Sequence, residues 1–149
     1  MEPLPSAALD QLFLEARTVN HFHDTPVPLA LLQEAYALAR MGPTSMNTQP
    51  ARYVFLCSAA ARERLRPALA AGNLEKTMQA PVTVIVAHDT QFYEHMPQIW
   101  HGVGAREKFA GNPASVAATA TRNGTLGGAY FMLAARALGL SCGPMGGFD

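Results

Sequence analysis

The sequence predicts an α+β or three-layer α/β/α domain, in which helices flank a small sheet. Apolar residues recur at helical spacing in several segments, and two short runs are rich in β-branched and aromatic residues. Hydrophobic residues make up 49% of the chain and charged residues 15%, which indicates a folded domain and excludes a disordered chain. A chain of 149 residues is long enough for a buried core, so we assign residues 1–149 to one domain.

Two helices are expected in the first third of the chain. Ser6 is expected to cap the first helix, which runs to about Arg17. Its apolar positions are Leu9, Leu12 and Phe13. The second helix follows Pro28 and ends at residues 41–43, where Gly precedes Pro. Its apolar positions are Leu31, Leu32, Ala35, Tyr36 and Ala39.

Two strands are expected, over residues 53–57 and 81–87. The second is apolar nearly throughout, which indicates that both of its faces are covered. Between the strands, Ser58 is expected to cap a helix from Ala59 to about Ala71. A sheet needs three or more strands to be independently stable, so the pattern indicates that something which completes this sheet is missing.

The second half of the chain is expected to hold one long helix. Residues 88–112 mix aromatic, charged, His and Gly residues and predict a surface excursion, with a flap over a ligand as one interpretation. Helical spacing returns over residues 113–140 and ends at Gly139, before a Gly-rich turn. The apolar side of this helix is Leu126, Tyr130, Leu133, Ala134 and Leu138. Close approach of two helices is expected at Gly124, Gly127 and Gly128.

Charge and hydropathy exclude several classes of partner. The formal net charge is +0, which favours neither nucleic acid nor an anionic membrane surface. The N-terminus lacks the pattern of a secretory signal, and the most apolar segment is shorter than the about 20 residues that a membrane span needs. Cys57 and Cys142 lack close partners and are interpreted as small core residues, so we expect a cytoplasmic protein.

Hydrogen-bonding side chains are concentrated in residues 42–50, between a helix and a strand. The candidates are Pro43, Thr44, Ser45 and Asn47. One interpretation is an ordinary hydrogen-bonded turn, since Ser, Thr and Asn favour turns. The other is a rigid collar of donors and acceptors around a flat polar ligand. Composition alone favours neither.

Two further segments each allow a structural and a functional interpretation. Arg17 either interacts with the last carbonyls of its helix or, with Thr18 and Asn20, holds a phosphate. Asn73 either caps a short helix or binds a ligand, and Lys76 is either solvated or paired with an anion.

The C-terminal segment is a third candidate. Glycines in residues 143–148 mark turns, but they also allow a ligand to approach the backbone. The five histidines lack metal-ligand spacing, and no nucleophile or phosphate-loop motif occurs, so we assign no catalytic residue and no metal.

Taken together, these segments resemble the FMN-dependent nitroreductase family. The matching segments are residues 16–22, 42–50, 71–74 and 143–149. Their order and spacing extend over essentially the whole chain. Within the family, the sequence is most similar to the malonic semialdehyde reductase (3-hydroxypropionate dehydrogenase) branch of pyrimidine degradation. That likeness lies in residues 64–69, 76–77, 80–83 and 136–140.

The resemblance implies a fold, an assembly and a set of FMN contacts. The fold is a nitroreductase-like three-layer α/β/α sandwich with a small, mainly antiparallel sheet, and the assembly is a homodimer with FMN at the interface. The residues implied for the phosphate and ribityl end are Arg17, Thr18 and Asn20. Those implied for the isoalloxazine are Pro43, Thr44, Ser45 and Asn47. Those implied for the ribityl chain or pyrimidine edge are Asn73 and Lys76. Those implied near flavin N5 are Pro144, Met145, Gly146 and Gly147.

The resemblance also implies an activity. NADH or NADPH would reduce the flavin, and a small electrophile would then take the hydride. Malonic semialdehyde, giving 3-hydroxypropionate, is the expected acceptor, and a broad nitro- or quinone-reductase is the alternative. Family members continue beyond the Gly-Phe-Asp motif at residues 147–149, so we expect a fold incomplete at the C-terminus and a longer native protein. A truncated, non-catalytic remnant is the third interpretation.

Overall fold

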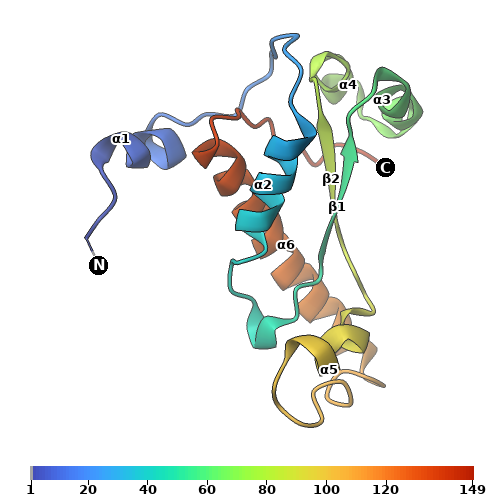
Figure 1. Cartoon of the computed structure of the whole chain (residues 1–149). Helices are drawn as coiled ribbons and strands as arrows, with labels where there is room; N and C mark the ends of the chain where they lie inside the picture. Colours follow the sequence, from blue (N-terminus) through green and yellow to red (C-terminus); the bar gives the residue numbers. More distant parts are fainter. Residues whose placement is uncertain (1) are drawn as a thin grey trace.

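The computed structural model describes residues 2–149 and contains helices around one two-stranded sheet (Figure 1). The strands are β1 (Ala51–Leu56) and β2 (Thr83–His88). The α-helices are α1 (Ser6–Leu9), α2 (Leu29–Ala39), α3 (Ala59–Leu65), α4 (Ala71–Gln79), α5 (Met96–Ile99) and α6 (Pro113–Ala137). A π-helical turn, η1, spans Asp10–Leu14, and 3₁₀ turns span Ser45–Asn47 (η2), Arg66–Ala68 (η3) and Phe92–His95 (η4).

The two predicted strands form an antiparallel ladder, which confirms the α+β class. Ala51 pairs with His88 at one end, and Leu56 pairs with Thr83 at the other. The chain therefore enters β1 and leaves β2 at the same end of the sheet. The expectation that both faces of the second strand are covered is wrong over its last three residues, which are exposed. Val54 of β1 is also 51% exposed. The reason is that α2 and α6 both pack on the opposite face, against Tyr53 and its neighbours.

Helix α6 crosses the covered face of the sheet at very short range. A Cβ atom added at Gly124 would lie 2.7 Å from Cβ of His88, and one at Gly127 would lie 2.4 Å from Cβ of Ala51. The glycines thus permit the predicted close approach, but to the sheet and not to a second helix. Because this glycine-lined side faces the strands, Leu126 is turned outward and is 41% exposed, contrary to the predicted apolar face.

Two hydrophobic clusters stabilise the fold. The first joins α2, α6 and the sheet around Ala35, Phe131 and Ala134. The second lies within residues 88–112 and the start of α6, where Phe92 and Met96 are fully buried. This segment was predicted to be a surface excursion, but it carries its own core because its aromatic side chains pack on one another and on α6.

The N-terminal helix differs from its predicted form. Pro5, not Ser6, is the N-cap, and the helix ends in a π-turn at Leu14, before Arg17. Of its predicted apolar positions, Leu9 and Phe13 are exposed and Leu12 is half-buried. A polar contact also joins this segment to the end of α6: the Gln11 side chain donates to the Arg136 carbonyl at 2.6 Å.

The ends of α3 and α6 follow local chemistry. The Ser58 hydroxyl accepts a hydrogen bond from the Ala61 backbone N–H at 3.2 Å, which confirms the predicted cap. The helix ends at Leu65, earlier than expected, because Pro67 cannot continue the backbone hydrogen bonds. Gly139 adopts φ +81° just beyond α6, as predicted for a helix end.

Both cysteines were predicted to be core residues, but neither is fully buried. Cys57, which directly follows β1, is exposed, so its assignment as a core residue is wrong. Cys142 is half-buried, and burial raises the pKa of its thiol. Across residues 2–149, no helix has the length and apolar character needed to cross a membrane.

Candidate functional site

The first group of candidate residues meets around α4, and we call it the α4 cluster. It consists of Asn20, Asn73, Lys76, Met145 and Gly147. The Asn73 side chain donates a hydrogen bond to the Gly147 carbonyl at 3.0 Å, and Nζ of Lys76 lies 3.4 Å from Oδ1 of Asn20. The Thr77 hydroxyl lies 3.5 Å from the Met145 sulfur. Two segments far from α4 in sequence, around Asn20 and around residues 145–147, therefore converge on this short helix.

Backbone pairing holds the C-terminal segment at this position. The Ala70 N–H donates to the Gly147 carbonyl at 3.0 Å, and the Val19 N–H donates to the Cys142 carbonyl at 3.1 Å. An isolated antiparallel bridge joins Leu69 to Phe148. Figure 1 shows this segment passing from the end of α6 to the region of α3 and α4. Its close fit explains Gly147, where an added Cβ would lie 2.6 Å from Nδ2 of Asn73.

The α4 cluster presents a cation and open backbone to its surroundings. Lys76 forms no ion pair with any residue in 2–149, since its one polar contact is the neutral Asn20 side chain. Pro144 and Gly146 are exposed, and nothing lies within 4 Å of a Cβ placed at Gly146. An unpaired ammonium group beside amide groups and accessible backbone is suited to an anionic, polar ligand.

Arg17 and Thr18 do not join the cluster through side-chain contacts. Arg17 donates to the Leu14 carbonyl at 2.7 Å and to the Ala16 carbonyl at 2.8 Å. These contacts agree with the first interpretation of Arg17, in which it binds the last carbonyls of its own helix. Both side chains are exposed. The predicted convergence of Arg17, Thr18 and Asn20 on a phosphate is therefore not preformed in this chain.

The second group of candidates lies in the loop of residues 43–50, which contains η2. Thr44 is extended, whereas Met46 and Asn47 have φ values of 50° and 52°. Such left-handed conformations in residues other than Gly persist where surrounding contacts impose them. The Met46 side chain packs against the core of residues 88–120, and Thr48 is almost fully buried. The packing of Met46 and the burial of Thr48 therefore hold the loop in one conformation.

Hydrogen bonds fix the amide side chains of this loop. Asn47 donates through Nδ2 to the Ile99 carbonyl at 2.8 Å and accepts at Oδ1 from Nε2 of Gln49 at 2.9 Å. Its carboxamide is thereby oriented toward the segment that follows α5. The Ser45 hydroxyl forms no hydrogen bond with residues 2–149 and is exposed, so it is available to a ligand.

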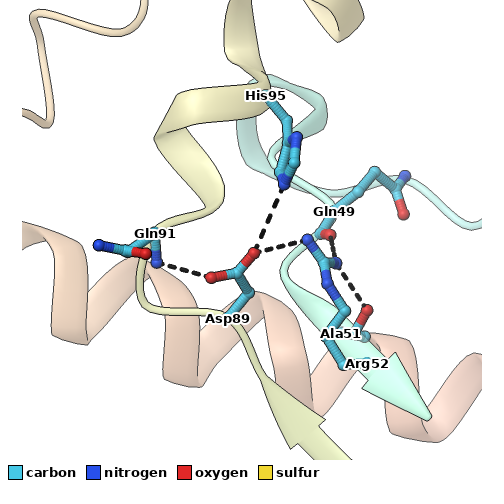
Figure 2. Close-up of polar contacts among 6 residues, drawn as sticks. All are labelled: Gln49, Ala51, Arg52, Asp89, Gln91 and His95. Atoms are coloured by element: carbon cyan, nitrogen blue, oxygen red, sulfur yellow. Dashed lines mark hydrogen bonds and ion pairs between the residues drawn. The ribbon is translucent and has the colours of Figure 1, made fainter.

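An ion pair closes the end of the sheet from which the loop emerges (Figure 2). Arg52 donates from Nη2 to Oδ2 of Asp89 at 2.7 Å and from Nη1 to the Gln49 and Ala51 carbonyls, each at 2.9 Å. Asp89 also accepts from the Gln91 backbone N–H at 2.7 Å, and Nε2 of His95 lies 3.7 Å from the same carboxylate. The pair links β1, β2 and η4 and fixes the exit of the 43–50 loop.

Four residues of this arrangement were not among the predicted site residues. Arg52 and Asp89 form the ion pair, and Tyr130 and Asn123 contact the loop from α6. The sequence shows Tyr130 only as an apolar helix position and Asn123 only within an Asn-Gly-Thr triplet. Neither feature of the sequence predicts that Asn123 contacts Ser45, 78 residues away, or that Tyr130 contacts Pro43, 87 residues away.

The α4 cluster and the 43–50 loop lie at opposite ends of the sheet. The loop precedes Ala51 and α4 precedes Thr83, and these residues stand at the two ends of a six-residue ladder. At about 3.4 Å per residue the ladder is roughly 17 Å long. Figure 1 shows α4 at the top of the sheet and the loop at the bottom. One chain therefore presents two separate groups of polar candidates, one at each end of the sheet.

The sequence matches known proteins over nearly its whole length. The family model described as Nitroreductase family matches residues 14–149. A Burkholderia lata protein named as an NADH dehydrogenase/NAD(P)H nitroreductase is 56% identical over 149 residues, covering 100% of this chain and 76% of that protein. A Ralstonia nicotianae protein of the same name is 55% identical, with the same coverage.

Solved structures agree with this match. A nitroreductase from Exiguobacterium sibiricum in complex with FMN superposes with a TM-score of 0.80 at 15% identity, covering 93% of this chain and 74% of that one. An NAD(P)H:FMN oxidoreductase from Staphylococcus epidermidis has a TM-score of 0.79 at 21% identity, covering 95% and 74%. These structures establish the nitroreductase-like fold. With the family match over residues 14–149 and relatives above 50% identity, they show that this chain belongs to the nitroreductase family.

Proposed function

We propose that this chain is a subunit of a dimeric, FMN-dependent reductase that takes hydride from NAD(P)H and passes it to a small electrophile. The observation that carries the proposal is the separation of its candidate residues into two clusters at the two ends of the sheet. The residues implied for the isoalloxazine fall in both: Ser45 and Asn47 in the 43–50 loop, and Gly146 and Gly147 near α4. A single ring system does not span the ladder, so one flavin needs two chains.

A symmetric dimer resolves this separation. A two-fold axis places the α4 cluster of one subunit against the 43–50 loop of its partner and generates two equal sites. Each site then receives an ammonium group and open backbone from one chain, and a hydroxyl and amide collar from the other. The names of the relatives, which refer to NAD(P)H, support the same reaction class.

The residues present fit FMN. Lys76 has no anionic partner within residues 2–149 and would lie beside the ribityl chain or the pyrimidine edge, where a positive charge favours the reduced cofactor. Gly146 leaves room for a flat ring to approach the backbone, and the free Ser45 hydroxyl adds a donor. The bound flavin supplies the hydride chemistry, while the protein orients it and excludes water.

Two acceptors are to be distinguished. Malonic semialdehyde is the first candidate, because residues 64–69 and 136–140 are similar to that branch of the family. A broad nitro- or quinone-reductase is the second, and the names of the relatives support it. Steady-state turnover with malonic semialdehyde, a nitroaromatic compound and a quinone, each with NADH and NADPH, separates them. A specificity constant that is highest for the semialdehyde by ten-fold or more supports the first, and comparable values support the second.

The reductase half-reaction is tested by visible absorption. The purified chain is incubated with FMN, passed through gel filtration and then mixed anaerobically with NADH. Retained flavin absorbance that bleaches with NADH supports the proposal, whereas a colourless protein contradicts it and favours a non-catalytic remnant.

The shared site is tested by mixing two variants. One subunit carries Asn73→Ala with Lys76→Met, and the other carries Ser45→Ala with Asn47→Ala. Neither is expected to bind FMN alone, but a mixed dimer has one site in which every contributing residue is native. Recovery of FMN binding after the subunits are exchanged supports the shared site. If all contacts come from one chain, the mixture remains as weak as its components.

A further inference from the structure

Helix α6 contacts the 43–50 loop on both sides of Thr44. The Tyr130 hydroxyl donates a hydrogen bond to the Pro43 carbonyl at 2.8 Å. Oδ1 of Asn123 accepts a hydrogen bond from the Ser45 backbone N–H at 2.8 Å. The two side chains are seven residues, or about two helical turns, apart and so project from the same side of α6. Thr44 is thus enclosed between two anchored backbone groups.

Asn123 is unusual among the polar residues of α6 because it is buried. Its exposed fraction is 4%, and its polar contacts are with the loop at Ser45 and with its own helix at Thr119. Both ends of its carboxamide are paired, since Nδ2 donates to the Thr119 carbonyl at 2.9 Å while Oδ1 receives the Ser45 N–H. The amide orientation is therefore determined, and the acceptor faces the loop. A buried amide satisfied in this way specifies one geometry.

The Ser45 N–H is the point at which the loop changes conformation. Thr44 is extended, with φ −130° and ψ 159°, and the tight turn begins at Ser45. The next two residues are left-handed, so the turn needs an external contact to persist. The bond to Asn123 therefore fixes the Ser45 backbone, while the exposed Ser45 hydroxyl forms no hydrogen bond of its own with residues 2–149.

From this geometry we infer that Asn123 is a positioning residue for the flavin-lining loop, acting through the Ser45 backbone. The inference rests on the proposed FMN site. Asn123 is too deeply buried to contact the cofactor, and its effect on binding is exerted through the orientation of Thr44 and Ser45. Its place in an Asn-Gly-Thr triplet has no bearing on this role, because a buried side chain is not available for modification.

The test compares two substitutions that keep the branched shape and the number of side-chain heavy atoms. Asn123→Leu removes the acceptor, whereas Asn123→Asp keeps an oxygen facing the Ser45 N–H. We expect Asn123→Leu to weaken FMN binding about ten-fold and to alter the visible spectrum of the bound flavin, because a lost hydrogen bond releases the loop. Asn123→Asp is expected to stay within about three-fold of the native affinity. If Asn123 merely fills space, the order is reversed, because an apolar side chain packs there better than a carboxylate.

Amide hydrogen exchange gives a readout that needs no flavin. The Ser45 N–H is expected to be protected in the native chain and in Asn123→Asp, and to exchange faster in Asn123→Leu. The control is Asn112→Ala, since Oδ1 of Asn112 also accepts one backbone N–H in α6, that of Ser115, but at the N-cap, about 16 Å along the helix from Asn123. This control is expected to lower the unfolding temperature while leaving FMN affinity and Ser45 exchange unchanged.

The outcomes separate the two proposals. If the native chain binds FMN and Asn123→Leu binds it equally well, the positioning role is overturned and the FMN site stands. If the native chain binds no FMN, the proposed function is overturned and the inference with it. Faster Ser45 exchange in Asn123→Leu, together with weaker FMN binding that Asn123→Asp restores, supports the inference.

Discussion

The Asn73 side chain donates a hydrogen bond to the Gly147 carbonyl at 3.0 Å, across 74 residues of sequence. The Ala70 N–H donates to the same carbonyl, also at 3.0 Å. The two bonds anchor the C-terminal turn to the start of α4. They also account for the presence of Asn at a helical position, where it is not the N-cap that the sequence had suggested.

Asn73→Ala is expected to loosen this turn. Loss of one partly buried hydrogen bond lowers the free energy of unfolding by about 1 kcal/mol, and FMN affinity falls about ten-fold if the turn contacts the flavin. Thermal unfolding and fluorescence titration with FMN measure the two effects. Gln79→Ala is the control, because it removes an exposed contact to Glu75 on the same helix. An equal loss of FMN affinity in both variants would argue against a local role for Asn73.

Lys76→Met is expected to weaken FMN binding and to reduce its dependence on salt. The ammonium group faces only the neutral Asn20 side chain, so its charge is available to an anionic ligand. Titrations at about 0.05 and 0.5 M salt compare this variant with Lys108→Met, whose lysine lies in the segment after α5. Identical salt dependence in native protein and Lys76→Met would show that the charge does not reach the ligand.

Gly127→Ala is expected to destabilise the fold by about 1–3 kcal/mol. The new Cβ would lie 2.4 Å from Cβ of Ala51, which is fixed to a strand and cannot move aside. Gly72→Ala is the matched substitution in a helix, and nothing lies within 4 Å of its Cβ. It is expected to stabilise by about 0.5–1 kcal/mol, because Ala favours the helix. Chemical denaturation of both variants measures the difference, and changes of the same sign would contradict the packing.

Asp89→Ala is expected to cost more than the loss of an ordinary surface ion pair. Asp89 accepts from both Arg52 and the Gln91 backbone N–H, so its loss leaves two donors without a partner. We expect a decrease of about 1–3 kcal/mol in unfolding free energy. Glu63→Ala, which removes a solvent-exposed pair with Arg66 at the junction of α3 and η3, is expected to change the free energy of unfolding much less, because water screens the pair. Equal unfolding temperatures for the two variants would show that the Asp89 contacts add nothing.

The two thiols are expected to react at different rates. Cys57 is exposed, whereas Cys142 is half-buried, and desolvation raises the pKa of its thiol. The thiolate is the reacting form, so a raised pKa lowers its fraction at neutral pH. Brief treatment with iodoacetamide followed by peptide mass spectrometry should label Cys57 first. Raising the pH should narrow the difference, and preferential labelling of Cys142 would contradict the described burial.

Elements whose cause is local were predictable from the sequence. The Ser58 cap, the end of α6 at Gly139 and the two β-branched strands all depend on residues within a few positions of one another. The wrong predictions concern surroundings. Cys57 and Leu126 are exposed, and Phe92 is in a core, because burial depends on which distant segment packs against a residue.

The sequence by itself determined the α+β class, the identity of the polar candidates and the resemblance to the nitroreductase family. It did so because helical spacing, strand composition and short motifs are written in neighbouring residues. Only the tertiary structure decided how those candidates are grouped. It brings Asn73 to Gly147 and Asn123 to Ser45, and it separates the α4 cluster from the 43–50 loop by the length of the sheet. These relations arise because the C-terminal segment pairs beside α4 and the glycine-lined α6 packs closely on the sheet, which brings together residues 74 or more positions apart.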